Sequence, residues 1–528
     1  MWNKIWYKIN NSIIGGALLI AVFSLLSKIF GLVRERLIAH NFGASELSDV
    51  YYSAFRLPDL IFNTLVLGAL TSAFIPVFQK VWQQNKEKGL ILANSLLNIF
   101  LIIISSLVIL AIIFTPQLMS FITPGFNEIQ LKEVISLTRI MLLAIIFFVG
   151  SNIIGGVLNS WKKFFSFSLA ASFYNIGIII GILYFYPFLG LTGLAWGVFL
   201  GAILHLLIQL PEAYKNGWHY RFTIKVTSDL KKILRLMLPR TLGLAAGQIN
   251  LLIITIIAST LTAGSIAIFN LANNLQSLPI SLFAVSLAIA VFPTFTQAIT
   301  DDKQKVFSDN FSSSFRKILF LLIPISILII VLRAQIVRVV LGSGAFDWQD
   351  TILTANTLGY FAISIFAQGL IPLLARSFYA FEDTKTPMMI SIFSIIINII
   401  LSFVLASKYS VFGLAIAFSL SSILNMVLLY IGLHKKIPHI SDVLILSSLL
   451  KISFNSLLAG IMAYATLYIM APLVDMHTFL GIFTQGFVAG MMGLLTYIIL
   501  SIVFKLDEVQ IIKKMLLKVI FLIKNGKH

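Results

Sequence analysis

Fourteen long apolar stretches follow one another along the chain, and polar residues, glycine or proline separate each from the next. A helix needs about 20 apolar residues to cross a bilayer, because each residue adds only about 1.5 Å. The pattern therefore predicts an all-α, polytopic membrane protein with fourteen spans. The predicted spans are residues 13–39, 50–80, 90–115, 133–159, 165–186, 190–212, 233–258, 264–298, 317–341, 352–381, 386–407, 411–433, 446–471 and 477–504.

The composition agrees with this class of protein. Of the 528 residues, 59% are hydrophobic and 11% are charged, whereas a soluble domain carries roughly 25% charged residues. These values exclude a soluble enzyme and a disordered chain. The chain has no cysteine, so a disulfide scaffold, a thiolate nucleophile and a cysteine-ligated metal are excluded as well.

The net charge of +18 comes from 38 Lys and Arg against 20 Asp and Glu. In a soluble protein such an excess would suggest nucleic acid, but here the basic residues gather in alternate loops between the spans. They fall at 80–88, 162–163, 215–235, 303–317, 435–436 and 505–518, while the opposite loops hold little beyond Lys132 and Lys408. Cytoplasmic loops carry the basic excess. We therefore expect both termini to be cytoplasmic and no nucleic-acid partner.

Two pairs of segments suggest an internal duplication. Residues 191–210 resemble residues 411–430, and the Ala-x-x-Pro-x-Phe pattern of residues 73–78 recurs at residues 290–295. Because an even number of spans separates the copies, the two halves run in the same direction and enclose a central cavity. We expect one six-helix lobe over 1–212, a second over 213–433, two further spans within 434–504, and a cytoplasmic amphipathic helix over 505–528.

Five basic residues lie in or near the interiors of the predicted spans: Lys28, Arg34, Arg56, Arg240 and Arg376. A charge at a lipid-exposed helix centre costs roughly 2.5–3.5 kcal/mol on insertion scales. These side chains must therefore extend to an interface, pair with an acid, or line a hydrated cavity.

In the first span, Lys28 and Glu35 are seven residues apart and share a helix face, while Arg34 points roughly 100° away. We expect Lys28 and Arg34 to line a cavity. Extension to the interface, or a structural pair with Glu35, is the alternative.

In the second span, Asp49 and Arg56 are also seven residues apart, so one face offers a carboxylate and a guanidinium. A local Arg56–Asp59 pair is the alternative to substrate contact. Arg240 follows a proline at the inner end of the seventh span, where interface placement competes with a cavity. Arg376 lies deeper in its span, which favours the cavity.

The chemistry of these residues points to an anionic substrate. Arginine binds phosphate and carboxylate through planar, bidentate contacts, so a cavity rich in Arg and poor in acids suits a phosphorylated lipid head group. A cation exporter would be expected to keep buried carboxylates. His205 stands alone in its span and is interpreted as a packing residue. No nucleophile motif, phosphate loop or metal-ligand spacing stands out, so we expect no enzyme, no cofactor and no metal.

Residues 31–60, GLVRERLIAHNFGASELSDVYYSAFRLPDL, carry a family resemblance, which the Gly68 to Pro76 stretch and the FYxxxDTKTP motif at 378–387 extend. The chain resembles the MurJ (MviN) lipid II flippases of the multidrug/oligosaccharidyl-lipid/polysaccharide exporter superfamily. The resemblance implies two lobes in a V around a cationic cavity for a pyrophosphate-sugar head group. It also implies a groove for the lipid tail in the last two spans. Alternating access would then move lipid II across the bacterial cytoplasmic (inner) membrane, with the protein acting as a monomer among membrane lipids.

The chain departs from the family pattern at several positions. Phe62 stands where members carry an arginine and Leu67 where they carry an acid, while Asn273 and Asn274 replace an Asp-Arg pair. Ser402 stands where members with a sodium site carry an aspartate. Our hypothesis is that Arg240 and Arg376 supply the missing positive charge.

Together these observations predict a substrate-binding set and a gate or ion-pair set. The substrate-binding set is Lys28, Arg34, Arg56, Arg240, Asn273, Asn274 and Arg376, and the gate or ion-pair set is Glu35, Asp49 and Asp59. The alternatives are an exporter of another polyprenyl-pyrophosphate-linked oligosaccharide and, less favoured, a MATE-like antiporter.

Overall fold

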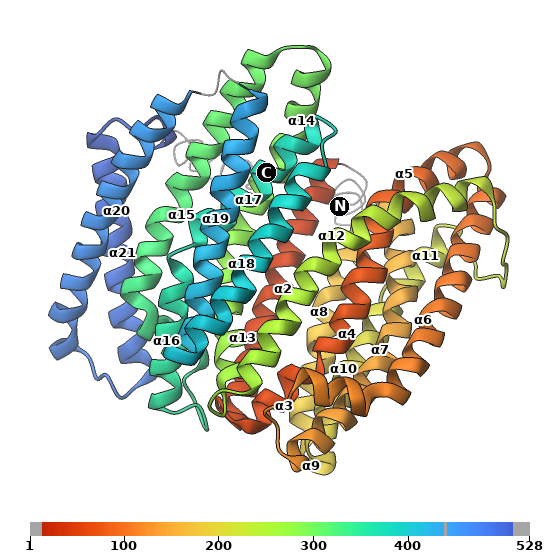
Figure 1. Ribbon diagram of the computed structural model, residues 1–528, viewed down its shortest axis with the longest axis horizontal. Coiled ribbons are helices and arrows are strands. Elements are labelled where there is room, and N and C mark those ends of the chain that lie inside the picture. Colours follow the sequence, from red (N-terminus) through yellow and green to blue (C-terminus); the bar gives the residue numbers. More distant parts are fainter. Residues whose placement is uncertain (1–12, 438–440, 510–528) are drawn as a thin grey trace, which may run out of the picture. The chain divides into compact units, whose positions relative to one another are not determined.

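The computed structural model describes residues 13–437 and 441–509 (Figure 1), and for residues 13–18, 67–73, 238–240 and 242–243 it describes the backbone alone. Within these ranges the chain forms helices and connecting loops, with no strand. The predicted amphipathic helix over 505–528 lies mostly outside the described residues. The chain divides into two compact units, residues 1–267 with 343–346, and residues 268–342 with 347–528.

The first unit is a helical bundle in which α10 packs on α7 and α8, α2 packs on α8, and α6 packs on α7. Its elements are α2 (Ile13–Phe42), α3 (Glu46–Ala54), α4 (Arg56–Ile61), the π-helical turn η1 (Phe62–Leu67), α5 (Gly68–Gln84), α6 (Lys86–Ile122), α7 (Glu128–Ser160), α8 (Phe164–Ile180), the π-helical turn η2 (Gly181–Phe185), α9 (Tyr186–Leu189), α10 (Leu191–Leu207), α11 (Leu210–Lys215) and α12 (Ser228–Ser259).

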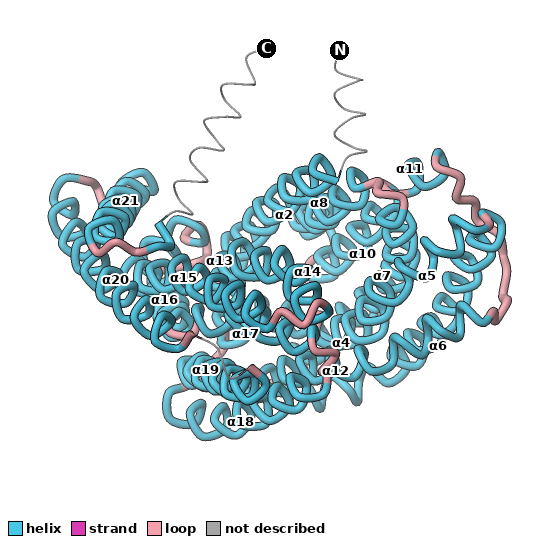
Figure 2. The backbone as a smooth tube through the Cα atoms, turned by 90° about the horizontal axis from the view of Figure 1, so that it is seen from above, coloured by secondary structure: helices cyan, strands magenta, loops and turns pink. Residues whose placement is uncertain are grey.

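The second unit packs α18 on α19 and α20 on α21, with α15 against α16, α20 and α21. The first helix of this unit, α13 (Ser265–Pro279), begins within the last residues of the first unit. The elements that follow it are the π-helical turn η3 (Ile280–Val285), α14 (Ser286–Thr300), α15 (Gln304–Leu341), α16 (Trp348–Ala362), α17 (Ile365–Ala380), α18 (Lys385–Tyr409), α19 (Val411–Lys436), α20 (Asp442–Met470), η4 (Ala471–Leu473), α21 (Phe479–Val503) and η5 (Asp507–Val509). Figure 2 shows how densely the helices pack in each unit.

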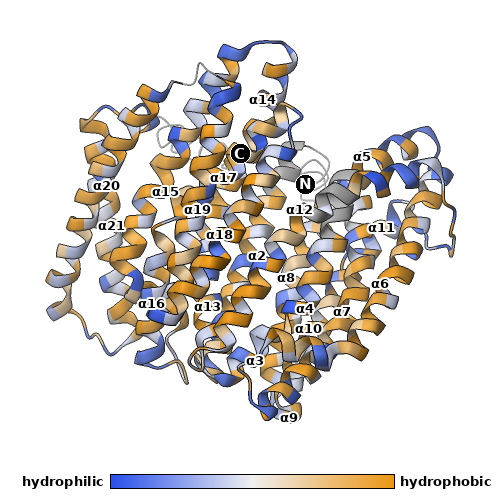
Figure 3. Cartoon of the chain, in the orientation of Figure 1, coloured by the Kyte–Doolittle hydropathy of each residue, from blue (hydrophilic) through white to orange (hydrophobic). Residues whose placement is uncertain are grey.

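The helices carry apolar side chains on their outer faces as well as in their cores. Ile109 and Ile113 of α6 are 59% and 58% exposed, and Figure 3 shows hydrophobic residues along most helices and hydrophilic ones gathered in the connecting segments. A helix that is apolar all round belongs in lipid or in a protein core. The fold is therefore that of an all-helical membrane protein, as predicted.

Each predicted span is largely helical over its described residues, but three are broken by turns, at residue 55, at residues 208–209 and at residues 363–364. Ten helices among those residues are long and apolar enough to cross a membrane, and α16 with α17, bent by 44°, make an eleventh if they count as one span. The other three predicted spans correspond to α2, to α3–α5 and to α12. In each of these three, part of the segment is described by its backbone alone, and the described remainder of α12 includes the shorter apolar helix Leu244–Ser259.

The backbone repeats its irregularities in the two halves of the sequence. A π-helical turn at residues 62–67 recurs at 280–285. Lys162 and Glu382, 220 residues apart, both have a φ of 58° after a helix end, and Gly190 and Ser410, again 220 apart, have φ values of 60° and 52° before the next helix. Non-glycine residues rarely adopt a positive φ. The shared spacing therefore supports the internal repeat.

Asp383, in the FYxxxDTKTP motif, fixes the start of α18. Its carboxylate accepts hydrogen bonds from the Thr386 backbone N–H and hydroxyl at 2.9 and 2.7 Å, and it pairs with Lys436 Nζ at 2.6 Å. Burial alone would raise the pKa of Asp383, but the bonds from Lys436 and Thr386 lower it to about 2. The carboxylate therefore stays charged at physiological pH.

A buried ion pair ties the segment after α21 to the rest of the second unit. Arg316 of α15 lies 2.6 Å from the Glu508 carboxylate, whose side chain is only 3% exposed. Ser448 of α20 donates a further hydrogen bond to Glu508 at 3.3 Å. Three elements thus meet at one desolvated carboxylate.

Replacing Arg316 with Met should lower the free energy of unfolding by about 3–5 kcal/mol, because the substitution leaves a buried charge without its partner. Chemical denaturation in detergent micelles measures the change. Asp507→Asn is the matched control, since Asp507 faces Arg316 at 3.7 Å with its side chain 80% exposed, and an exposed pair contributes about 0–1 kcal/mol. Equal losses in the two variants would contradict the assignment.

Candidate functional site

The charged residues of the first unit meet around Arg34 on α2. The guanidinium pairs with the carboxylate of the neighbouring Glu35, and Arg34 Nη1 donates to Asn175 Oδ1 of α8 at 3.1 Å. The Arg34 side chain remains 21% exposed, while that of Glu35 is 6% exposed. The structural pair considered for Arg34 is therefore present, and the guanidinium still reaches the surface of the unit.

Glu35 has a second partner on another helix. The Tyr52 hydroxyl of α3 donates to Glu35 Oε2 at 2.5 Å. Tyr51 beside it is 2% exposed and packs its ring edge-on against Phe55 at 5.1 Å. Glu35 is therefore held by its own helix and by the buried aromatic face of α3.

Asn175 sets the position of the Arg34 guanidinium. Its amide nitrogen donates to the carbonyls of Ser27 and Ala171 at 3.2 and 3.1 Å. These bonds fix the orientation of the amide, so its oxygen faces Arg34. Asn175 was not among the predicted residues, and neither was Tyr52. Asn175 could have been identified from the sequence, because it is an isolated asparagine within the predicted apolar span 165–186.

Arg56 and Asp59 extend the cluster onto α4, where both are half-buried. The Asp59 carboxylate interacts electrostatically with Arg56 and also with Arg34, so charges of α2 and α4 act on one another. Lys28 is half-buried on α2, two turns before Glu35. Phe62 is the first residue of the π-helical turn η1, and its ring centroid lies 4.9 Å from that of Phe148. An apolar contact therefore stands at the position where the family resemblance leads us to expect an arginine.

Asp49, predicted as a gate or ion-pair residue, binds backbone N–H groups at the start of α13 (Ser265–Pro279). Its side chain is 4% exposed, and its two oxygens accept backbone N–H bonds from Gly264 at 2.7 Å and from Ala267 at 2.8 Å. The N–H groups at a helix start lack partners within the helix. The carboxylate therefore caps the first turn of α13.

The candidates of the second unit lie among uncharged polar side chains. Arg376 Nη1 donates to the Pro372 carbonyl of its own helix at 3.4 Å, and no described carboxylate lies within ion-pair distance of Arg376. Asn273 Oδ1 accepts from Gln276 at 3.0 Å, and Gln276 in turn accepts from Gln368 of α17 at 2.9 Å. Asn274 is half-buried one residue further along α13.

Arg240 belongs to α12 by its backbone, and its side chain lies outside the described part of the structure. His205, interpreted as a packing residue, lies 2.5 Å from the Ser151 hydroxyl and packs edge-on against Phe148. These contacts fit a packing role.

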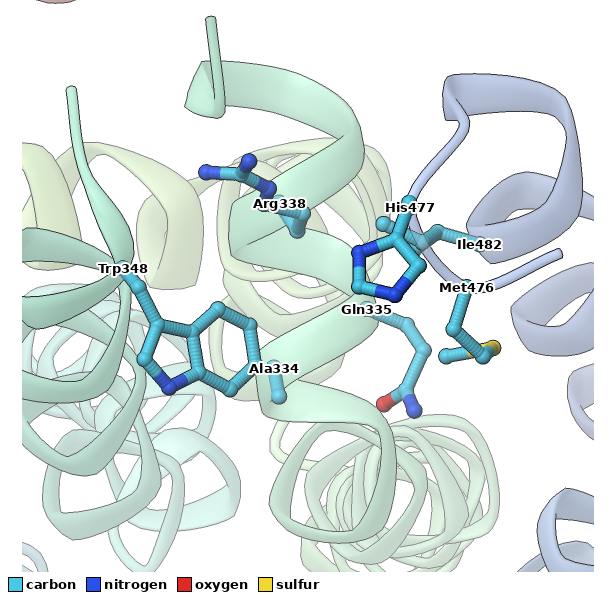
Figure 4. A pocket seen from close by; sticks show the side chains of 7 residues that line it. All are labelled: Ala334, Gln335, Arg338, Trp348, Met476, His477 and Ile482. Atoms are coloured by element: carbon cyan, nitrogen blue, oxygen red, sulfur yellow. The ribbon is translucent and has the colours of Figure 1, made fainter. Parts of the chain in front are cut away.

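A cavity of about 410 Å³ lies in the second unit, between α15, the start of α16 and the α20–α21 connection. Figure 4 shows Arg338, Trp348 and His477 around it. Its other lining residues are Ala334, Gln335, Met476 and Ile482. None of the predicted site residues lines this cavity, so its volume is no measure of the candidate site.

The model of the family described as "Lipid II flippase MurJ" matches residues 38–484, which include Arg56 and Asp59 of the cluster and begin shortly after Arg34 and Glu35. The chain belongs to the MurJ family. A probable lipid II flippase MurJ of Buchnera aphidicola subsp. Schizaphis graminum is 31% identical over 424 residues, which cover 79% of this chain and 82% of that protein. Its counterpart in Vibrio cholerae is 29% identical over 446 residues, covering 81% and 84% of the two chains.

Solved structures give the same result. A lipid II flippase MurJ in an inward closed conformation is 27% identical, covers 93% of this chain and 99% of its own, and has a TM-score of 0.78. An inward-facing MATE transporter of the MOP superfamily, 14% identical with a TM-score of 0.68 over 79% of this chain and 96% of its own, shares the fold alone. The predicted family and fold class are confirmed.

Replacing Asp49 with Ala should lower the free energy of unfolding of this MurJ-family chain by about 1.5–3 kcal/mol, because two backbone N–H groups lose a charged acceptor. Denaturation in micelles gives the value. Glu46→Ala, at an exposed position of the same helix, should change stability by less than about 0.5 kcal/mol. A capping role would be refuted if the two variants were equally stable.

Proposed function

We propose that this protein moves lipid II from the inner to the outer leaflet of the bacterial cytoplasmic membrane by alternating access. Membership in the MurJ family supports the proposal, as do the relatives named as probable lipid II flippases. The observation that carries it is the Arg34 cluster, in which two guanidinium groups and Lys28 lie on apolar helices beside two carboxylates, those of Glu35 and Asp59. The transporter has no catalytic step in this cycle.

The Arg34–Glu35 pair provides a way to bind and release a pyrophosphate. Arg34 reaches the surface of its unit and offers planar N–H donors that match phosphate oxygens. A pyrophosphate that binds Arg34 displaces Glu35, which keeps the hydrogen bond from the Tyr52 hydroxyl. Because Glu35 is not left without a partner, the exchange avoids the cost of an isolated buried charge.

The remaining candidates supply charge and polar contacts in this scheme. Arg56 and Lys28 add positive charge near Arg34, and Asp59 balances it when no substrate is bound. Arg240 and Arg376 contribute charge toward the same head group, in place of the family arginines that are missing. Asn273 and Asn274 offer uncharged hydrogen-bonding groups suited to sugars.

The lipid tail requires an apolar surface, and the last two spans offer one. α20 and α21 pack on each other while Ile461 and Leu480 remain 64% and 71% exposed. We assign this pair of helices to the polyprenyl chain and the halves 1–212 and 213–433 to the head group. The bias of Lys and Arg among the loops supports cytoplasmic termini. The scheme needs one copy of the chain, with membrane lipids as its surroundings.

Complementation of cells depleted of their lipid II flippase tests the proposal. Arg34→Ala should lower outer-leaflet lipid II by about tenfold or more at normal abundance, since a charge-assisted hydrogen bond contributes about 1.5–3 kcal/mol. Arg139→Ala, the same substitution at an exposed position of α7, should complement fully.

Other outcomes have definite meanings. Failure of the abundant wild-type protein to restore lipid II transport would favour an exporter of another polyprenyl-pyrophosphate-linked oligosaccharide. Full complementation by Arg376→Ala would remove Arg376 from the binding set and leave the Arg34 cluster unaffected.

A further inference from the structure

Residues 219–226 join α11 to α12 in a segment that is neither helix nor strand. The sequence HYRFTIKV alternates polar and apolar residues without exception. Trp218 before it is 2% exposed, and the Thr227 hydroxyl after it caps α12 by accepting from the Leu230 N–H at 3.2 Å. The segment therefore lies between two fixed ends, and Figures 1 and 2 show it alongside α6.

Three side chains of α6 bind the backbone of this segment at alternate residues. The carbonyl of His219 accepts from Asn94 at 2.9 Å, those of Arg221 and Thr223 accept from Asn98 at 3.3 and 3.1 Å, and the N–H of Lys225 donates to the Ser95 hydroxyl at 3.1 Å. In extended chain, alternate residues turn their backbone groups to the same side. The segment is thus an extended ribbon held against α6.

The apolar residues between these anchor points are exposed. Tyr220 is 48%, Phe222 73%, Ile224 46% and Val226 58% exposed. Phe222, Ile224 and Val226 share one face, because side chains alternate with period two in an extended chain, whereas the Tyr220 hydroxyl donates to Asn98 Oδ1 of α6 at 3.1 Å. A contiguous exposed apolar face of this kind marks a surface that contacts something other than water.

The position of the segment along α6 indicates what it contacts. Ile102 and Ile103 of α6 are 50% and 49% exposed, and Ile102 lies only about 6 Å beyond Asn98 along the helix. Lys86 and Lys88 mark the polar end of the same helix. The segment therefore lies where the lipid-facing surface of α6 begins. Backbone groups at that depth need protein partners, which Asn94 and Asn98 supply.

The charge around the segment indicates that it contacts anionic lipids. Residues 211–235 hold six basic residues against two acidic ones, and basic clusters are attracted to anionic lipid surfaces. We propose that residues 219–226 form a membrane-surface anchor that places Phe222, Ile224 and Val226 among acyl chains and binds anionic lipid head groups through Arg221 and Lys225.

The absence of cysteine from the chain permits a direct test on the full-length protein. Phe222→Cys is labelled with an environment-sensitive fluorophore and reconstituted in phosphatidylglycerol-containing vesicles whose acyl chains carry nitroxide quenchers. The label should lose most of its fluorescence. Lys215→Cys, at an exposed position on α11, is the matched control and should keep its fluorescence while remaining sensitive to aqueous iodide.

Two further measurements separate the parts of the proposal. Asn98→Ala should weaken lipid quenching at position 222, because the ribbon loses its hold on α6. Replacing phosphatidylglycerol by phosphatidylcholine, or Arg221 and Lys225 by Gln, should weaken it as well. Unchanged quenching in these last two experiments would overturn the binding of anionic head groups.

Two results at position 222 would overturn the anchor itself. Quenching by iodide as strong as at position 215, without quenching by lipid nitroxides, would show a solvated loop. A blue-shifted label reached by neither quencher would show that protein covers this face. The test involves no lipid II and no transport, so its result is independent of the proposed function.

Discussion

The hydrocarbon interior of a membrane offers no hydrogen-bonding partner, so each polar group on a spanning helix must find one within the protein. The Arg34 guanidinium does so with Glu35 and Asn175, and Glu35 finds a second partner in Tyr52. Packing alone would not require α2, α3 and α8 to meet at these side chains. The charges that we propose bind an anionic lipid head group thus also hold the helices of the first unit together.

Much of the fold could be predicted from the local sequence pattern. A membrane span is defined by about 20 consecutive apolar residues, and such a run can be recognised without knowing its tertiary contacts. Each of the fourteen predicted spans is largely helical where it is described, although turns break three of them. Charges within such runs are visible locally too, which is why Arg34 and Arg56 could be identified. The π-helical turns at 62–67 and 280–285 gave no comparable signal, since they insert an extra residue without changing hydropathy.

The partners of these charges could not be predicted, because they lie far away in the sequence. Asn175 is 141 residues from Arg34, and Gly264 is 215 residues from Asp49. Spacing on one helix suggested that Asp49 faces Arg56, whereas its carboxylate caps α13 instead. A carboxylate that binds substrate and one that binds backbone N–H groups look alike in sequence, and only tertiary contacts distinguish them.

The paired irregularities of the backbone also carry a record of descent. Two unrelated helical bundles would not acquire positive φ values at positions 162 and 382, and again at 190 and 410, with the same interval. The single half that was duplicated must already have had these bends. At 410 a serine occupies the conformation that a glycine holds at 190, so the two halves share this bend although they differ in the residue that adopts it. A gene for one half, placed in the membrane as two identical copies, would be the simplest ancestor of this transporter.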